Sequence, residues 1–454
     1  MEIIIIGAGP GGYAAALYAA KRGIKVTLIE KGEVGGTCLN RGCIPTKALL
    51  HSAGLYHRLK SAADLGIKLS VEGFDYAQMR KRSDGIVSKL RGGVEFLLKK
   101  AGVSMITGTA SIIGGGQVSV ASKDGEQTLR ADKIIIATGS APTDIPAAPA
   151  DGHMIMNSDH ALELYKLPES LAIIGGGVIG CEFAQAFARL GCEVTIIELA
   201  PQLLPGVDAD ISALLFKALK NDGVQIYLNA RATNIYRTES GVSVEFSAGQ
   251  GKSKLSAQKL LAATGRKPNL AWLENTGIEQ TDGFININAQ MQTNIPGIYA
   301  VGDVTGGIQL AHTASFGGIT AVKHILGEHA EFSSCVPMCV YTEPEIASAG
   351  LTYDAARQAG FNCRTGVFPL SANPRAVIEG AADGFAKTVL DEDGTIIGAH
   401  LAGPNATEMI SLIGGLINFQ TAASDMAEII FAHPSFSEII PESVAAADKM
   451  ALHI

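Results

Sequence analysis

The chain has 454 residues, of which 47% are hydrophobic, and it carries a formal net charge of −8. This length exceeds that of one ordinary core and indicates two to four domains. The negative charge argues against a nucleic-acid partner, and no apolar run approaches the roughly 18 to 20 residues of a membrane span. Glu2 stands where a signal peptide carries a basic residue, so we expect a cytoplasmic protein with no membrane anchor.

The chain begins with a strand, a glycine turn, an alanine-rich helix and a second strand, "IIIIGAGPGGYAAALYAAKRGIKVTLIE". Gly7, Gly9 and Gly12 fit G-x-G-x-x-G, and Glu30 ends the second strand. This context predicts a dinucleotide site, with a pyrophosphate at the helix N-terminus and a ribose on Glu30. A tight turn without a ligand is the alternative.

The next stretch, "GGTCLNRGCIPTK", holds two of only seven cysteines. Cys38 and Cys43 are five positions apart, and positions i and i+5 lie about 140° apart on an ideal helix. A bridge between them therefore needs a distorted segment, for which Pro45 supplies a reason. A closely spaced, strained pair is reactive, but an inert bridge or two merely buried thiols remain open. The other five cysteines are expected to be small buried residues, and no metal site is expected because Cys335 and Cys339 lack zinc-site spacing.

The dinucleotide pattern recurs in "LAIIGGGVIGCEFAQAFARLGCEVTIIE". Gly175, Gly177 and Gly180 form the second fingerprint, and Glu198 ends its second strand. Two fingerprints imply two dinucleotides. "DKIIIATGSAP" and "KLLAATGRKPN" each read as a strand that ends in Ala-Thr-Gly, and each is expected to return the chain to one of the two sheets.

The last third of the chain has a different pattern of predicted strands and helices. "NIPGIYAVGDVTGGIQLAH" predicts a strand that ends at Asp303, where open α/β sheets bind ligands, and a helix that begins near Leu310. Beyond about residue 330, "KTVLDEDGTIIGAHLAG" predicts antiparallel strands and "ATEMISLIGGLINFQ" an apolar helix. This part reads as an α+β domain with apolar surface that suits dimerisation.

The cysteine stretch resembles the redox-active disulfide segment of the flavoprotein disulfide reductases. The resemblance covers the whole chain, through both fingerprints, "VGDVTGGIQLAH" and "HPSFSE". It implies an α/β fold with two Rossmann-like dinucleotide-binding domains, for FAD and NAD, and a C-terminal α+β dimerisation domain. The implied FAD-binding domain spans 1–145 and is completed by about 266–328, the NAD-binding domain spans 146–265 and the dimerisation domain spans 329–454.

The resemblance also implies the residues that bind each cofactor. Those for FAD are Gly7, Gly9, Gly12, Glu30, Thr37, Lys47, Ala110, Thr138, Gly139, Ser140, Asp303, Ala311 and His312. Those for NAD are Gly175, Gly177, Val178, Ile179, Gly180, Glu182, Glu198 and Gly265.

The catalytic roles follow from the same resemblance. Cys38 is similar to the interchange thiol that reacts with substrate sulfur, and Cys43 to the thiol beside the flavin. Lys47 resembles the lysine near the flavin ring, and Glu182 the acid that pairs with it. A solvated helix lysine and a surface helix acid are the respective alternatives.

Near the C-terminus, "FAHPSFSEII" places His433 five residues before Glu438. Ser435 and Glu438 fit a helix capping box, which explains the acid without catalysis, and a lone histidine is more often structural. In the family, however, the matching histidine is the acid/base for dithiol chemistry, the glutamate orients it, and the histidine reaches the disulfide of the other subunit. The resemblance therefore implies a homodimer.

Within the family, the chain is most similar to the dihydrolipoamide dehydrogenases. Glu198 favours a free ribose hydroxyl, and the following "LAPQLLP" offers no arginine for a phosphate, which indicates NAD rather than NADP. We expect FAD-dependent oxidation of dihydrolipoamide, carried by the lipoyl-bearing protein of a 2-oxoacid dehydrogenase, acetoin dehydrogenase or glycine cleavage system. An NADH-dependent reductase of another disulfide and a scaffold subunit are the alternatives. Arg41 and Phe431 depart from the family pattern, and the sequence leaves open their effect on substrate preference.

Overall fold

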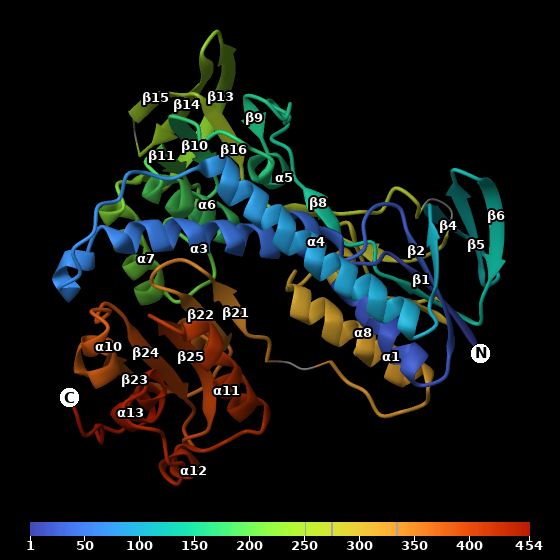
Figure 1. The fold of residues 1–454 in the computed structure, drawn as a ribbon. Coiled ribbons are helices and arrows are strands. Elements are labelled where there is room, and N and C mark those ends of the chain that lie inside the picture. The colour runs from blue at the N-terminus through green and yellow to red at the C-terminus, as the bar shows by residue number, and fades with distance from the viewer. Residues whose placement is uncertain (250, 274–275, 333–334) are drawn as a thin grey trace.

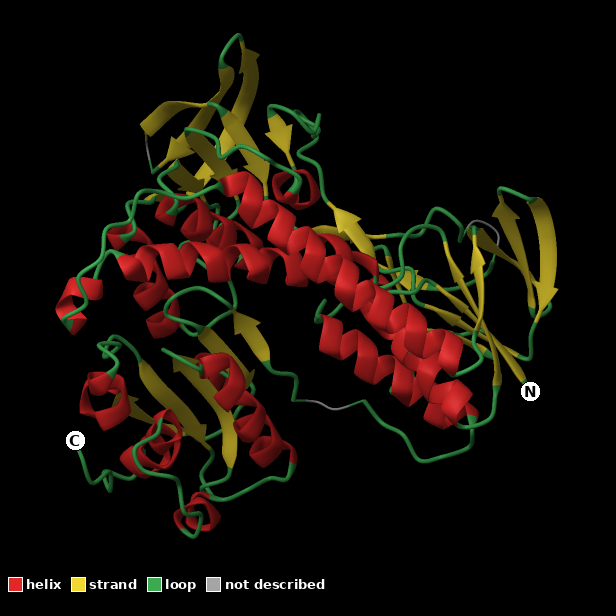
Figure 2. Ribbon diagram, viewed as in Figure 1, coloured by secondary structure: helices red, strands yellow, loops and turns green. Residues whose placement is uncertain are grey.

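The structure, a computed structural model, describes residues 1–249, 251–273, 276–332 and 335–454. Figure 1 shows three sheet-based units, with helices α3 (Cys43–Leu59) and α4 (Tyr76–Lys100) running along their junction. Figure 2 shows that helices cover the first two sheets and that the C-terminal unit mixes strands with short helices. The expected class, α/β with a C-terminal α+β unit, is confirmed.

The first unit is a parallel sheet in the order β20-β7-β1-β2-β3. Its strands are β1 (Glu2–Ile6), β2 (Lys25–Glu30), β3 (Ser104–Thr107), β7 (Lys133–Ile136) and β20 (Ile298–Ala300). The isoleucines of β1 are all at most 5% exposed, as expected of a central strand that is covered on both faces. The sheet therefore takes its strands from two distant stretches of the chain.

Helices and a small antiparallel sheet complete this unit. They are α1 (Pro10–Lys21), α2 (Gly36–Arg41), α3 (Cys43–Leu59), η1 (Ala62–Leu65), α4 (Tyr76–Lys100), β4 (Thr109–Gly114), β5 (Gln117–Ser122), β6 (Gly125–Arg130), η2 (Gly302–Thr305) and α8 (Ala311–Ile325). Helices α1 and α8 lie side by side (Figure 1). They are so close that a Cβ on Gly318 would lie 2.4 Å from the Gly11 carbonyl oxygen. Only glycine allows this approach.

The second unit repeats the plan with a parallel sheet in the order β12-β11-β10-β16-β9. Its elements are β9 (Ile155–Met156), α5 (Ser158–Leu162), β10 (Ser170–Ile174), α6 (Val178–Arg189), β11 (Glu193–Ile197), α7 (Ala209–Asn221), β12 (Gln225–Tyr227), β13 (Ala230–Thr238), β14 (Gly241–Ala248), β15 (Gly251–Ala257) and β16 (Lys259–Ala262). The two Ala-Thr-Gly segments lead into β8 (Ser140–Pro142) and β17 (Arg266–Pro268), which pair with each other and join the two units. A short hairpin, β18 (Gln280–Thr281) and β19 (Phe284–Ile285), follows.

The C-terminal unit is an antiparallel sheet in the order β21-β22-β25-β24-β23. Its elements are β21 (Met338–Val340), β22 (Ile346–Gly350), α9 (Tyr353–Gln358), β23 (Arg364–Pro369), η3 (Leu370–Ala372), α10 (Pro374–Ile378), β24 (Phe385–Leu390), β25 (Ile396–Ala402), α11 (Ala406–Asn418), α12 (Ala423–Ala427), η4 (Phe436–Glu438) and α13 (Ile439–Ala446). The predicted strand pair and apolar helix are therefore confirmed as β24–β25 and α11.

One hydrophobic cluster joins all three units. It contains Ala53 of α3, Phe183 and Phe187 of α6, and Val340 and Ile346 at the edge of the C-terminal sheet. Because these residues are at most 1% exposed, the units are docked through a dry core rather than through solvent. None of the described helices has the length and apolarity needed to cross a bilayer.

Candidate active site

The two cysteines of the "GGTCLNRGCIPTK" stretch lie on either side of a helix break. Cys38 belongs to α2 and Cys43 is the first residue of α3, with Gly42 between the two helices at φ −143° and ψ −112°. A Cβ on Gly42 would lie 2.9 Å from the Thr37 carbonyl oxygen. The expected distortion is present, but its assignment to Pro45 was wrong: that residue lies in the first turn of α3, where proline fits a helix.

The break brings the two thiols together. They are unbridged in the structure, and a side-chain hydrogen bond joins them. This bond, burial and the neighbouring sulfur raise the pKa of Cys38. The same bond lowers the pKa of Cys43 to about 7, against burial and with help from the Lys47 cation. In the reduced pair these effects favour the thiolate on Cys43.

Lys47 and Glu182 form an ion pair next to the cysteines. The Lys47 Nζ lies 2.9 and 2.8 Å from the two carboxylate oxygens. Glu182 is only 3% exposed, so the alternative of a surface helix acid is wrong. Tyr341, which the sequence did not indicate, donates its backbone N–H to Glu182 Oε1 at 3.0 Å and places its ring 4.7 Å from the Lys47 Nζ.

The first glycine fingerprint builds a cradle between β1 and α1. Gly7 has φ +102°, and a Cβ on Gly12 would lie 1.8 Å from the Gly7 carbonyl oxygen. The described N-terminus of α1 has no side-chain cap, which leaves its N–H groups for an anion. Glu30 accepts the N–H of Ala8 at 2.6 Å and that of Gly32 at 2.8 Å, and a carboxylate has lone pairs left for a ribose. These residues fit FAD.

The second fingerprint repeats this geometry at α6. Gly175 has φ +109°, a Cβ on Gly180 would lie 2.0 Å from the Gly175 carbonyl oxygen, and Gly177 faces open space. Val178 and Ile179 form the first turn of the helix, which again has no side-chain cap in the described structure. Glu198 accepts N–H groups from Gly176 and Ala200, and Gly265, φ +103°, turns the chain after the second Ala-Thr-Gly. These residues fit a pyridine dinucleotide.

A polar cluster joins the strands that link the two units. Ser140 donates its hydroxyl to Asp303, and Arg266 donates Nε to the Ser140 Oγ at 2.8 Å. Arg266 was missed because nothing in its local sequence separates it from a surface arginine. Next to this cluster the Thr138 hydroxyl donates to the Asn269 carbonyl oxygen at 3.1 Å, and Gly139 has φ +64°.

The remaining predicted FAD residues lie at the borders of this unit. Thr37 is in the first turn of α2, and Ala311 and His312 begin α8. His312 contacts the Pro337 carbonyl oxygen through Nε2 at 2.7 Å. Ala110 lies on the outer sheet, on β4, and is buried. No group of three or more His, Cys, Asp or Glu within the described ranges could hold a metal ion.

His433 and Glu438 lie in the segment between α12 and α13 of the C-terminal unit, with Glu438 at the end of η4. Glu438 uses one oxygen for each of its expected roles. Its Oε1 bonds His433 Nδ1 at 2.8 Å and its Oε2 accepts the Ser435 N–H at 2.7 Å. The Ser435 hydroxyl has no partner in the described structure, so only half of the capping box forms. The His433 side chain is 65% exposed.

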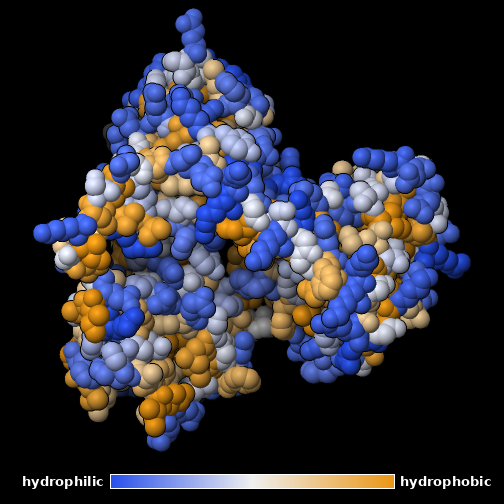
Figure 3. All heavy atoms as spheres, viewed as in Figure 1, coloured by the Kyte–Doolittle hydropathy of each residue, from blue (hydrophilic) through white to orange (hydrophobic). Residues whose placement is uncertain are grey.

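Large apolar side chains are exposed on the C-terminal unit. Ile430 is 98% and Phe419 85% exposed, and Figure 3 shows hydrophobic side chains over the C-terminal unit at the lower left. Large exposed apolar residues of this kind mark protein interfaces. The C-terminal unit, which carries His433, therefore has exposed apolar side chains suited to contact with another chain.

Comparisons with known proteins agree with this geometry. Residues 1–318 match the family described as pyridine nucleotide-disulphide oxidoreductase, and residues 336–444 match its dimerisation domain. A dihydrolipoyl dehydrogenase from Bacillus subtilis is 42% identical over 100% of both chains, and one from Zymomonas mobilis is 40% identical over 100% of this chain and 99% of its own.

Solved structures are similar in the same way. LpdA from Mycobacterium tuberculosis has a TM-score of 0.92 and 30% identity, covering 98% of this chain and 99% of that one. The HOCl-induced flavoprotein disulfide reductase RclA from Escherichia coli has a TM-score of 0.85 and 31% identity, with coverages of 98% and 99%.

Proposed function

Because the chain belongs to the pyridine nucleotide-disulphide oxidoreductase family, we propose that it oxidises a protein-bound dihydrolipoyl group to the lipoyl disulfide and reduces NAD to NADH. The family consists of flavoprotein disulfide oxidoreductases that bind FAD and a pyridine nucleotide. The observation that carries the proposal is the unequal thiol pair, in which the pKa of Cys43 is lowered to about 7 and that of Cys38 is raised. Identity of about 40% to dihydrolipoyl dehydrogenases over the full length supports the substrate.

The chemistry begins on the oxidised pair. His433 of the partner subunit takes a proton from one substrate thiol through Nε2, while Glu438 holds Nδ1. The resulting thiolate attacks the Cys38 sulfur, the Cys38–Cys43 bond breaks, and Cys43 leaves as a thiolate. The second substrate thiol loses its proton to solvent and attacks the substrate sulfur of the mixed disulfide, which frees the lipoyl disulfide. Cys38 then takes the proton that His433 holds.

The reduced pair must next give up two electrons. Bound FAD supplies the acceptor that reoxidises the two thiols, and bound NAD carries the electrons onward as hydride. Cys43 is the sulfur prepared for this step, because its lowered pKa increases the fraction of thiolate near neutral pH. Lys47 stabilises that thiolate by its charge.

The site is complete only in a dimer. His433 lies between α12 and α13 of the C-terminal unit, whereas the cysteines lie on α2 and α3, and the dimerisation domain supports a homodimer. Glu198 supports NAD over NADP, since its carboxylate occupies the end of β11 where a ribose phosphate would require a cation. The lipoyl group is proposed to come from a separate carrier protein.

The test is His433→Gln in the purified flavoprotein. Loss of a positioned acid/base costs about 10²- to 10⁴-fold, so NAD-dependent oxidation of dihydrolipoamide should fall by that factor. NADH oxidation by an artificial electron acceptor, which needs no thiol proton transfer, should stay close to wild type. Equal loss of both activities would overturn the role, and a colourless protein without either activity would favour a scaffold.

A second candidate function, reduction of another disulfide by NADH, is favoured by the similarity to RclA. The two reactions use the same cysteines and differ in the substrate site. Steady-state rates with lipoamide, glutathione disulfide and both nicotinamides separate them, because the proposed enzyme should prefer lipoamide and NADH by a wide margin.

A further inference from the structure

One face of α6 carries a buried polar stripe. Glu182, Gln185 and Arg189 are spaced by three and four residues, which places them on the same side of the helix. They are 3%, 1% and 9% exposed, in a helix whose other faces are packed with apolar side chains. Buried polar groups of this kind need specific partners.

A single loop between β21 and β22 supplies a partner to each of them. Tyr341 donates its N–H to Glu182, as described above. Glu343 donates its N–H to Gln185 Oε1 at 2.6 Å and accepts Gln185 Nε2 on its carbonyl oxygen at 2.8 Å. The Glu343 carboxylate pairs with Arg189. The loop is therefore fixed to α6 along two turns of helix.

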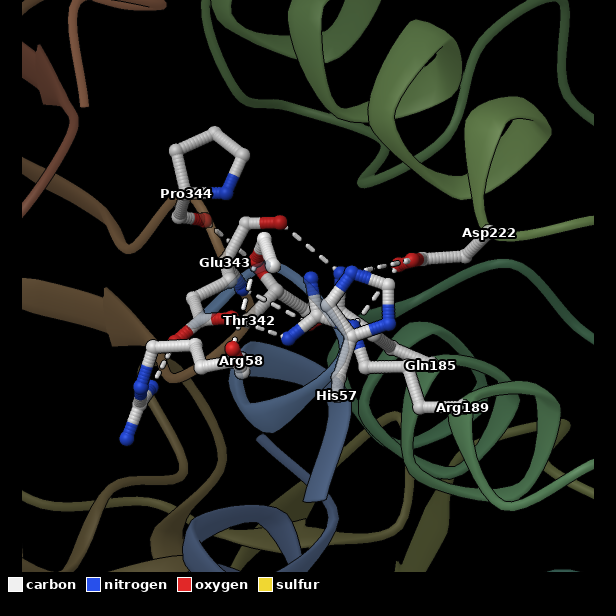
Figure 4. Close-up of polar contacts among 9 residues, drawn as sticks. His57, Arg58, Gln185, Arg189, Asp222, Thr342, Glu343 and Pro344 are labelled. Atoms are coloured by element: carbon white, nitrogen blue, oxygen red, sulfur yellow. Dashed lines mark hydrogen bonds and ion pairs between the residues drawn. The ribbon is translucent and has the colours of Figure 1, made fainter. Parts of the chain in front are cut away.

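The Glu343 carboxylate is the anchor of the loop (Figure 4). It is held between the guanidinium groups of Arg58 from α3 and Arg189 from α6. Arg189 also pairs with Asp222 at 3.0 Å, and His57 lies 3.8 Å from the same carboxylate. Burial, and next the Arg189 cation, lower the pKa of His57. Charges from two units thus set the position of a loop that belongs to the third.

The Tyr341 ring connects this loop to the redox centre, because it contacts Lys47. The Lys47 ammonium lies between the Glu182 carboxylate on one side and the face of this ring, 4.7 Å away, on the other. A cation over an aromatic face is attracted to it. We propose that Tyr341, anchored through Glu343, is a positioning residue that holds the Lys47 ammonium beside Cys43 and so tunes the reactivity of that thiol.

The charges around Cys43 make the position of Lys47 matter. Cys38 on α2, Lys47 on α3 and Glu182 on α6 act on its pKa, the last in the opposite sense to the lysine. Tyr13 on α1 is also near the sulfurs. Burial, and to a smaller extent the charges of Cys38 and Cys43, raise the pKa of Tyr13. A small displacement of the ammonium therefore changes the balance between Lys47 and Glu182. The inference rests on the proposed role of Cys43 as the reactive thiolate.

The experiment measures Cys43 itself. Reduced holoenzyme is alkylated with iodoacetamide over a pH series, and trypsin, which cuts after Arg41, places the two cysteines on separate peptides for mass spectrometry. Tyr341→Leu should raise the midpoint for Cys43 by about half a pH unit, a roughly threefold change in thiolate fraction. Tyr341→Phe, which keeps the ring face, should restore the midpoint, and Tyr353→Leu is the matched control elsewhere in the C-terminal unit.

A second background separates positioning from loosening of the fold. In Lys47→Met, Tyr341→Leu should cause no further shift, because the cation on which the ring acts is gone. An equal shift in both backgrounds, or none in either, would overturn the inference. Because alkylation does not require dithiol turnover, the inference can fail while the proposed function stands, and a loss of turnover in His433→Gln does not bear on it.

Discussion

The hydrogen bond between the two thiols should control which of them ionises. It is the largest cause of the lowered pKa of Cys43, which falls from 9.0 to about 7. This lowering of the pKa is a net effect, because burial acts in the opposite direction. At pH 7 about half of the Cys43 thiols are ionised, compared with about 1% for an ordinary thiol.

Cys38→Ala removes the donor and leaves the burial and Lys47 in place. The pKa of Cys43 should then rise by about one unit or more, and alkylation at pH 7 should slow by about tenfold. Cys38→Ser keeps a hydroxyl that can donate to the thiolate, so its midpoint should stay near that of the reduced wild type. Neither variant can form the disulfide, and each therefore reports on a single thiol.

The assay is the pH dependence of iodoacetamide labelling on the Gly42–Lys47 tryptic peptide, checked by thiolate absorbance in the ultraviolet. The reasoning is refuted if Cys38→Ala and wild type share one midpoint, because the bond between the sulfurs then does not set the ionisation. It is also refuted if the serine and alanine variants shift together, since that outcome assigns the effect to packing.

Three further sets of substitutions test other parts of the site. Lys47→Met leaves the buried Glu182 without its cation and should lower the free energy of unfolding by about 3 kcal/mol, whereas Lys47→Met with Glu182→Leu should recover most of this loss in urea unfolding. Gly180→Ala should lower the melting temperature, because its Cβ would lie 2.0 Å from a carbonyl oxygen. Gly177→Ala, whose Cβ meets open space, should keep the melting temperature and raise KM for NADH. Equal melting temperatures of the two variants would contradict this contrast. Glu198→Ala should reduce the preference for NADH over NADPH in kcat/KM by about tenfold, and an unchanged ratio would contradict the assigned role.

The parts of the site that the sequence predicts are those with local causes. A glycine at position 12 is required by the carbonyl oxygen of Gly7, five residues away, and the same logic fixes Gly175 and Gly180. The cysteine pair was recognisable because an unusual residue type occurs at a spacing that needs a break. The break itself was misplaced, since a glycine with negative φ leaves less trace in a sequence than a proline does.

The missed residues have causes that are distant along the chain. Tyr341 and Arg266 follow or begin ordinary strands, and their partners Lys47 and Ser140 lie on other elements. Tyr341 and Arg266 make these contacts only when the units are docked, so no local sequence pattern predicts them. The double use of Glu438 is a similar case, because one carboxylate oxygen contacts His433 and the other accepts the Ser435 N–H.

The same dependence on docking determines how this site works. A carboxylate as buried as Glu182 is costly unless it is both paired and hydrogen-bonded, and its cation comes from α3 while its N–H donor comes from the C-terminal unit. Neither the first nor the second unit alone can therefore stabilise this acid. Since the Lys47–Glu182 balance acts on Cys43, the reactivity of the thiol pair depends on contacts among all three units. Weakening the Glu343 anchor should thus disturb the thiolate before it unfolds any sheet.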